Sequence, residues 1–395
     1  MRSFVLILVL LGSVPLATAQ IERLPRPEVV QATQYGAAVD FDGDRVVVGA
    51  SGEASCGENA GAAYVYDRNE QGSFVLAARL TPKDCQPEQF FGRYVALDGD
   101  RVVIAAAAQF FNPLRPNAAY IFERQPDGSW AQTGKLAGLV RDDEGAFAAC
   151  VAISDAWALV TAEADPATGA VGAAYLYRRV GQGWKFAERL QVTGPPRSRA
   201  GASCAFDTDR FVVAAPSTDP RKSGSLFVFA AASPPDASAS DPPSWVFQHR
   251  IDGLRGQSLP VALDGGQLLV GEPGADRRAG RATLFAADQD GAWQRAATLE
   301  PAQDYDQGGF GLDVALNGGR ALVVGYAEQL DRTTNVDRVV YSFVHDEASG
   351  TWRQRQIFDL GRYAFGAAVS LVGREALVGE AASEAVGAAY LVRLM

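Results

Sequence analysis

Three carboxylates at alternate positions stand out near the N-terminus of this 395-residue chain. Asp40, Asp42 and Asp44 lie in the stretch "AVDFDGDRVVVGAS", with a glycine between the last two. Alternating oxygen ligands suit Ca²⁺, and a close pair of acids suits general acid–base catalysis. An Asp-Gly pair between two apolar runs also signals a tight β-hairpin, because its central residues need positive φ. The stretch alone leaves a metal site, a catalytic pair and a hairpin turn open.

Other side chains with catalytic potential are few. The chain contains no G-x-S-x-G nucleophile motif, and its only histidines are His249 and His345. We expect both histidines at surface positions, His249 in an outer strand and His345 in a turn. Acid groups in "RDDEG" and "QDYDQGG" are of the type that a glycosidase uses as a pair, although solvated loop charge also explains them. These acids are Asp142, Asp143, Glu144, Asp304 and Asp306.

An internal repeat supplies the elements that must position these groups. Segments such as "YGAAVDFDGDRVVVGA" and "FGRYVALDGDRVVIAA" recur along the chain, followed by a "GAAYVY"-like segment and then usually an aromatic one. Each unit therefore has four short runs rich in Val, Ala, Tyr, Phe and Leu, separated by turn residues. The second residues of the recurring segments fall at positions 36, 92, 148, 201, 256, 311 and 366.

Seven four-stranded units of nearly constant period predict an all-β, seven-bladed β-propeller with antiparallel blades. The last unit ends at Met395 after only three strands. The segment "QIERLPRP", residues 20–27, resembles the fourth strands of other units, so we expect it to complete blade seven. Residues 20–395 would then form one domain, whose ring closes by pairing the two chain ends and leaves no open edge. The recurring aromatics, such as Phe91 and Phe310, are expected to pack between blades.

The pairing of "FG" with a downstream "GAAY" segment resembles the FG-GAP repeat of the integrin α-chain N-terminal propeller. It is still more similar to bacterial secreted proteins built only of such repeats. The resemblance covers residues 20–395, although Ala200 and Arg255 replace the aromatic and Ala148 replaces the glycine in single units. It implies a propeller fold, and it implies little about function, because one fold hosts many sites.

In proteins of this kind, some blades bind Ca²⁺ in the loop between the first two strands, where a further acid follows the alternating ones. No acid follows Asp44 within that turn, and no other unit repeats the three alternating acids. We therefore expect a hairpin turn here and no cofactor. A calcium site formed by Asp40, Asp42 and Asp44 is the alternative.

Four cysteines in an exported chain predict disulfides. In an up-and-down meander, the loops that contain Cys56 and Cys85 emerge on the same face, so we expect these two residues to be bonded. Cys150 and Cys204 lie near the start of innermost strands in neighbouring blades, offset by one place in the repeat. A bridge and two buried thiols both remain open for this pair.

Features that do not repeat are better candidates for a binding surface than the scaffold itself. One loop carries two adjacent phenylalanines, and two others carry basic pairs on the same face as the cysteine loops. Such a face on an acidic chain fits a protein or an anionic glycan, whereas ordinary loop variation would also explain it. The candidates are Phe110, Phe111, Arg221, Lys222, Arg277 and Arg278.

The N-terminus has the form of a signal peptide over residues 1–19, with Arg2, a long apolar stretch and "ATA" before Gln20. This pattern predicts export to the periplasm or the medium. No later segment approaches 18 unbroken apolar residues, so no membrane span is expected. The net charge of −10 makes nucleic acid an improbable partner.

These observations predict an exported, non-catalytic and monomeric scaffold for interaction or adhesion, with a protein or a glycan as its ligand. Two other functions stay open. One is a glycan-binding or glycan-cleaving propeller that uses carboxylates of the inter-blade loops. The other is a calcium-dependent adhesin.

Overall fold

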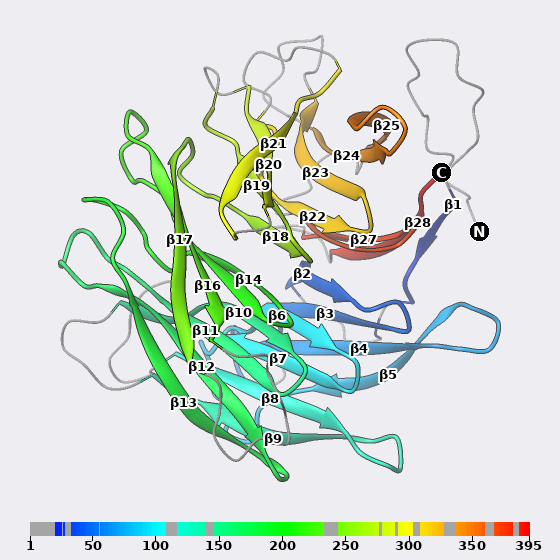
Figure 1. Cartoon of the computed structure of the whole chain (residues 1–395). Helices are drawn as coiled ribbons and strands as arrows, with labels where there is room; N and C mark the ends of the chain where they lie inside the picture. Colours follow the sequence, from blue (N-terminus) through cyan, green and yellow to red (C-terminus); the bar gives the residue numbers. More distant parts are fainter. Residues whose placement is uncertain are drawn as a thin grey trace.

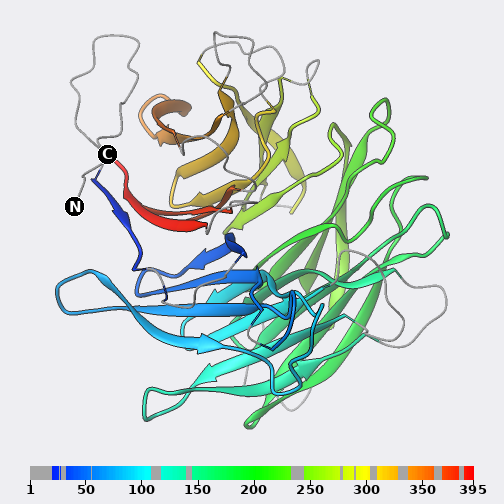
Figure 2. The same cartoon turned by 180° about the vertical axis from the view of Figure 1, so that it is seen from behind.

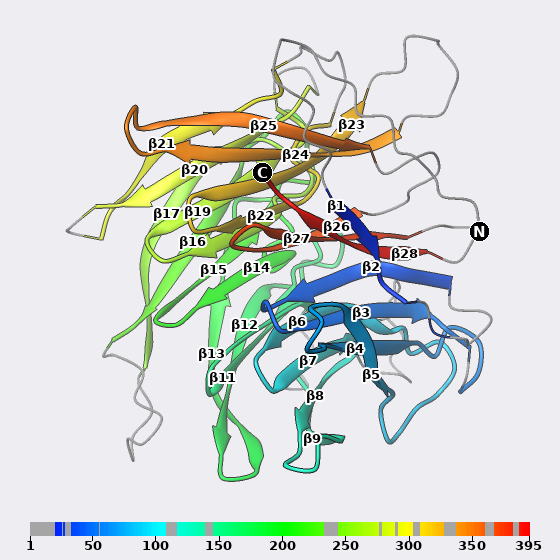
Figure 3. The same ribbon diagram turned by 90° about the vertical axis from the view of Figure 1, so that its right-hand side faces the viewer.

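The structure is a ring of seven four-stranded antiparallel sheets (Figure 1). A computed structural model of the chain describes residues 20–25, 27, 33–54, 56–107, 117–138, 145–232, 244–275, 279–288, 291–302, 309–327, 337–359, 367–381 and 387–395. Figures 2 and 3 show the same ring from behind and from the side. The sheets confirm the predicted seven-bladed propeller, and the described residues contain no helix.

Each blade is a meander whose first strand lies innermost. Blade 1 contains β2 (Thr33–Phe41), β3 (Arg45–Gly52), β4 (Ala62–Arg68) and β5 (Phe74–Leu80); blade 2 contains β6 (Phe91–Asp98), β7 (Arg101–Ala106), β8 (Ala118–Arg124) and β9 (Trp130–Leu136). Blade 3 contains β10 (Ala146–Ser154), β11 (Trp157–Glu163), β12 (Gly172–Val180) and β13 (Gly183–Val192); blade 4 contains β14 (Ser203–Asp207), β15 (Arg210–Ala215), β16 (Gly224–Ala231) and β17 (Trp245–Leu254).

The remaining blades follow the same order. Blade 5 contains β18 (Val261–Asp264), β19 (Gln267–Glu272), β20 (Arg281–Ala287) and β21 (Trp293–Leu299); blade 6 contains β22 (Val314–Asn317), β23 (Arg320–Ala327), β24 (Asp337–Asp346) and β25 (Thr351–Asp359). Blade 7 contains β26 (Ala367–Val372), β27 (Glu375–Glu380), β28 (Ala388–Arg393) and β1 (Gln20–Arg23).

The position of a strand in its blade explains its residue pattern. The second strand β3 reads "RVVVGASG" and is buried on both faces, because neighbouring blades cover both sides of the sheet. The outer strand β5 is buried mainly at its ends, Phe74 and Leu80, and its middle is exposed. Continuous apolar runs therefore mark the inner strands, whereas outer strands carry polar side chains.

The FG segment of one blade packs against the GAAY segment of the blade before it. Phe91 forms a parallel bridge with Gly61 and lies edge-on to Tyr120, with ring centroids 5.7 Å apart. Gly92 has φ +90°, and a Cβ at this position would lie 2.2 Å from the Ala62 carbonyl oxygen. Glycine is therefore required by both backbone conformation and close approach. The predicted packing of Phe91 and Phe310 between blades is confirmed, because both are buried in clusters that include side chains of the preceding blade.

The two ends of the described chain close the ring. Strand β1 pairs antiparallel with β28, with Gln20 opposite Arg393 and Arg23 opposite Tyr390 (Figure 1). Leu24 continues this contact, since its N–H donates to the Ala389 carbonyl at 2.9 Å. The pairing agrees with the predicted closure by the N-terminal strand. The expected signal peptide lies outside the described residues and stays a prediction.

Candidate functional site

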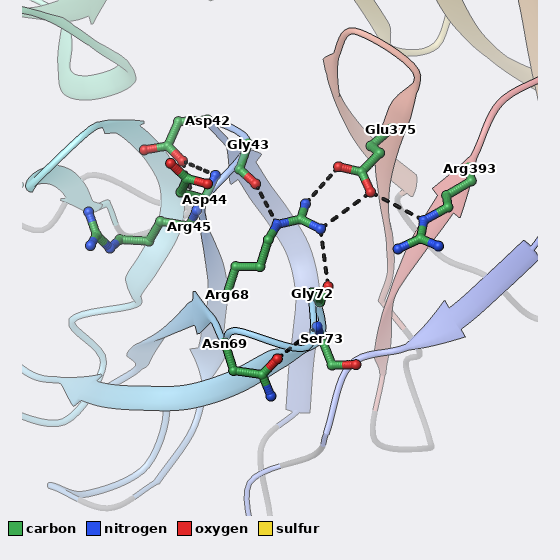
Figure 4. Close-up of polar contacts among 10 residues, drawn as sticks. All are labelled: Asp42, Gly43, Asp44, Arg45, Arg68, Asn69, Gly72, Ser73, Glu375 and Arg393. Carbon is green, nitrogen blue, oxygen red and sulfur yellow. Dashed lines mark hydrogen bonds and ion pairs between the residues drawn. The ribbon is translucent and has the colours of Figure 1, made fainter.

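The three aspartates of the opening stretch lie at the β2–β3 hairpin, and each has its own surroundings. Asp40 accepts hydrogen bonds from the Leu97 N–H of blade 2 and the Ser370 hydroxyl of blade 7, each at 2.8 Å. Asp42 accepts two bonds within its own turn, from the N–H groups of Asp44 at 3.0 Å and Arg45 at 2.8 Å (Figure 4). Within the described ranges, no group of three or more His, Cys, Asp or Glu side chains is arranged to hold a metal ion.

In four other blades, the residue that corresponds to Asp42 bonds to the next blade. In each case the side-chain oxygen accepts the backbone N–H at the tip of the neighbouring hairpin. The acceptors and donors are Asp98 and Asp155 (2.5 Å), Asp207 and Gly265 (2.7 Å), Asp264 and Gly318 (2.7 Å), and Asn317 and Gly373 (2.8 Å). The repeated acid of the hairpin therefore joins blades as well as shaping a turn.

The remaining interfaces use other links. Blade 3 has Ser154 at the acceptor position, and there the Cys150–Cys204 disulfide joins blades 3 and 4, with a Cα–Cα distance of 5.9 Å. Asp40 joins blade 1 to blades 2 and 7, as described above. Asp313 adds a second bond between blades 6 and 7 by accepting the Val369 N–H at 3.0 Å. We call this closed set of links, one or more at each of the seven interfaces, the inner girdle.

The inner girdle surrounds a central cavity of about 660 Å³, lined by the innermost strands. Among the described residues, Asp40, Asp313 and Arg338 are the charged ones that line it. Burial raises the pKa of Asp40 to about 6 and that of Asp313 to about 7, although backbone N–H donors oppose the shift in both cases. Each of these two carboxyls thus already accepts hydrogen bonds from backbone N–H groups of the ring.

The opposite ends of the blades define two faces of the propeller. The loops after the second and fourth strand of each blade form what we call the loop face, and the hairpins at the other ends form the turn face. The Cys56–Cys85 disulfide, with a Cα–Cα distance of 6.0 Å, joins two loops of the loop face as predicted. The sequence left open whether Cys150 and Cys204 are bonded or remain as two thiols, and the structure contains a disulfide between them.

Buried glutamates near the ends of second strands were not identified in the sequence. Glu53 is 1% exposed and accepts bonds from the Tyr64 hydroxyl and from Arg79. Glu272 is 0% exposed; its Oε1 lies 3.0 Å from Arg281 Nε and 2.5 Å from the Thr283 hydroxyl. The sequence signal that could have revealed these residues is a glutamate at the end of an otherwise apolar run, followed further along the same unit by an arginine. These ion pairs anchor the bases of the loops.

Three loops of the loop face are bonded together around blade 4: the loop before β14, the β15–β16 loop and the loop before β18. The Arg197 carbonyl accepts the Thr218 N–H at 2.9 Å and the Thr218 hydroxyl at 2.8 Å. Arg255 Nη1 donates to the Arg221 carbonyl at 3.1 Å. Three loops that carry cations at separate places in the sequence are thereby joined.

We call these cations the basic loop cluster. Its members are Arg197, Arg199, Arg221, Lys222 and Arg255. All are exposed except Arg199, which is partly buried and paired with Glu163. The sequence identified only Arg221 and Lys222. Arg199 immediately precedes the recurring segment of the fourth unit, and Arg255 is the first residue of that segment in the fifth unit. A cation at the start of this segment in two successive units was the signal that could have revealed them.

Several candidates from the sequence lie outside the described residues. They are Phe110, Phe111, Asp142, Asp143, Glu144, Arg277, Arg278, Asp304 and Asp306. His249 lies in the outer strand β17, as expected. The expected turn position of His345 is wrong, because this residue extends β24 by pairing with Trp352, and the two rings lie 5.4 Å apart.

Fold and inner girdle together define a seven-bladed β-propeller of four-stranded blades. The sequence profile of the FG-GAP repeat matches residues 20–66 and 74–122, which include the strands of blade 1 and most of those of blade 2. The first two blades of this β-propeller thus match the FG-GAP repeat, and the resemblance inferred from the sequence is confirmed there.

Solved structures share the fold at low sequence identity. The periplasmic gluconolactonase PpgL of Pseudomonas aeruginosa has a TM-score of 0.50 and 15% identity, over 82% of this chain and 86% of that protein. The WD40 repeats of RRP9 have a TM-score of 0.55 and 12% identity, over 96% of this chain and 100% of that one. No curated protein sequence gave a significant match. At such identities the likeness concerns the fold alone.

No described segment forms a helix long and apolar enough to cross a bilayer.

Proposed function

We propose that this protein is an exported, non-catalytic interaction scaffold that binds a partner through its loop face. The observation that carries the proposal is a contrast between the inner girdle and the loop face. The described acids that line the central cavity serve as links of the inner girdle. The loop face instead presents cations that are not needed to build the blades. Binding residues are commonly placed on loops that a rigid scaffold positions.

The disulfides support the exported location. The described residues contain two disulfides and no free cysteine. Disulfides persist in oxidising compartments such as the periplasm and the extracellular medium. Either location agrees with the signal peptide that the sequence predicts.

A catalytic role receives less support from the geometry. Asp40 and Asp313 are the acids with raised pKa on the channel wall, and such groups are candidates for acid–base chemistry. Both, however, accept backbone N–H groups from neighbouring blades. Their positions are explained by blade assembly without a substrate.

A photo-crosslinking experiment tests the scaffold function. A photoreactive residue is introduced at Gln257, which is exposed on the loop face, or at Ser349, which is exposed on the turn face. The tagged mature protein is irradiated with envelope and medium fractions of the producing organism. We expect a discrete crosslinked partner from position 257 and none from position 349.

Two results would contradict the proposal. Equal crosslinking from both positions would indicate nonspecific contact, and no crosslinked partner from position 257 would leave the loop face without a function. Turnover of an envelope polysaccharide that is lost in Asp313→Asn, with the fold intact, would instead favour a propeller enzyme.

A further inference from the structure

The three loops of the basic loop cluster concentrate positive charge on an acidic protein. Residues 193–202, 216–223 and 254–260 contain five cations and one acid, Asp219, whereas the whole chain has a net charge of −10. The Asp219 carboxylate is directed to the backbone, since Oδ1 accepts the Arg221 N–H at 3.0 Å. Like charges held close together repel one another, and an anionic partner removes that cost.

The three loops of the cluster are held together by hydrogen bonds to backbone carbonyls. Arg197 has φ +64°, a left-handed conformation that is unfavourable for arginine. Its carbonyl is fixed there by two bonds from Thr218. Arg199 Nη1 lies 3.5 Å from the Gln257 carbonyl of the third loop. Such backbone strain is commonly stored at binding sites, where neighbouring contacts maintain it.

We propose that the basic loop cluster is the docking site for an acidic segment of a partner protein. This inference rests on the proposed function and specifies the chemistry of its partner. Four of the five cations are arginines, whose forked donors match carboxylates in two-bond geometry. Arginine clusters are a known means of recognising acidic peptide motifs.

The composition of the three loops favours a polypeptide over a glycan. The three ranges contain no Phe, Tyr or Trp, so these loops provide no aromatic face on which a sugar ring could stack. Rows of aspartate or glutamate side chains need only the guanidinium and ammonium groups that the cluster presents. An anionic glycan is therefore the competing ligand in the test.

The test measures binding of a fluorescent oligo-glutamate peptide by anisotropy at low ionic strength. The variant Arg221→Glu/Lys222→Glu reverses two exposed charges of the cluster. The control Arg295→Glu/Arg374→Glu makes the same change in net charge at exposed residues of β21 and of the β26–β27 turn. We expect the cluster variant to bind about tenfold more weakly, and the control to change affinity by less than about twofold.

Unchanged binding by the cluster variant would overturn the proposal, and so would an equal loss in the control, because only net charge would then matter. Binding of polygalacturonate but not oligo-glutamate would assign the site to a glycan. Circular dichroism and thermal melting verify that both variants are folded. If the crosslinked partner at position 257 is captured equally by the cluster variant, the scaffold function stands and this site is refuted. If neither partner nor peptide binds, both fail.

Discussion

Arg68 of blade 1 and Glu375 of blade 7 meet at the seam of the ring, with Nη2 2.6 Å from Oε2 (Figure 4). The two residues are 307 positions apart in the chain, so only ring closure brings them together. The Arg68 guanidinium also lies 4.5 Å from the centroid of the Phe74 ring, and its Nε donates to the Gly43 carbonyl at 2.8 Å. This pair therefore connects the blade that closes the ring to the first hairpin.

Replacing Glu375 with Gln should destabilise the seam. The variant preserves the shape of the side chain but removes the charge that faces Arg68 and Arg393. We expect the free energy of unfolding to fall by about 2 kcal/mol, because hydrogen bonds to charged groups contribute about 1.5–3 kcal/mol. Urea titration followed by tryptophan fluorescence measures the change.

The matched control for this seam variant is Arg353→Gln. Arg353 pairs with Asp346 at 3.4 Å, but its side chain is 55% exposed. An exposed pair of this kind contributes about 0–1 kcal/mol. Equal losses in the two variants would show that the seam pair has no special role.

Substitutions at the position of the FG glycine should change stability in opposite directions in blades 2 and 3. Gly92→Ala should destabilise by about 3 kcal/mol or more, because the new Cβ meets the Ala62 carbonyl at 2.2 Å and φ is positive. Ala148 occupies the matching place in blade 3 with φ +62°. Ala148→Gly should therefore stabilise by about 0.5–1 kcal/mol, since it relieves left-handed strain at some cost in chain entropy. Thermal melting of both variants checks the signs, and a stabilising Gly92→Ala would contradict this account.

The repeat carried most of the fold information. Its period predicted the blade count, and the missing fourth strand of the last unit predicted closure by residues 20–27. The Cys56–Cys85 bond followed from meander topology, because loops of the same kind emerge on one face. These features are encoded locally and repeated, so a single sequence reveals them.

Contacts between units were harder to predict. Within its own unit, Asp98 is typical of a hairpin turn, yet its carboxylate accepts the Asp155 N–H of the next blade. The basic loop cluster was missed for the same reason, since Arg255 reaches the Arg221 carbonyl, and Arg199 the Gln257 carbonyl, only in the folded ring. Ser154 stands where several other hairpins carry an acid, and a disulfide spans that interface instead. This exception was the sequence signal that the hairpin acids link neighbouring blades.

The stability of the ring should respond to the titration of Asp313. Burial raises the pKa of this carboxyl from 3.8 to about 7, so the fold favours its neutral form. The associated stability is present below about pH 4 and is lost as the pH rises toward 7, by at most about 1.4 kcal/mol per pH unit. Asp313→Asn stays neutral and should lack this loss. Urea titrations of both proteins between pH 4 and 8 measure the difference, and parallel curves would contradict the prediction.

The interface between blades 3 and 4 offers the sharpest test of the inner girdle. The Cys150–Cys204 bond closes a separation of 54 residues, so Cys150→Ala/Cys204→Ala should lose about 3–4 kcal/mol by loop-closure entropy. Adding Ser154→Asp to that variant places a carboxylate where the other blades accept the next hairpin, and the expected donor is the Thr208 N–H. We expect it to restore about 1 kcal/mol. Ser154→Ala in the same background is the control and should restore nothing. If aspartate and alanine have equal effects on the urea midpoint, the hairpin acids do not hold the blades together.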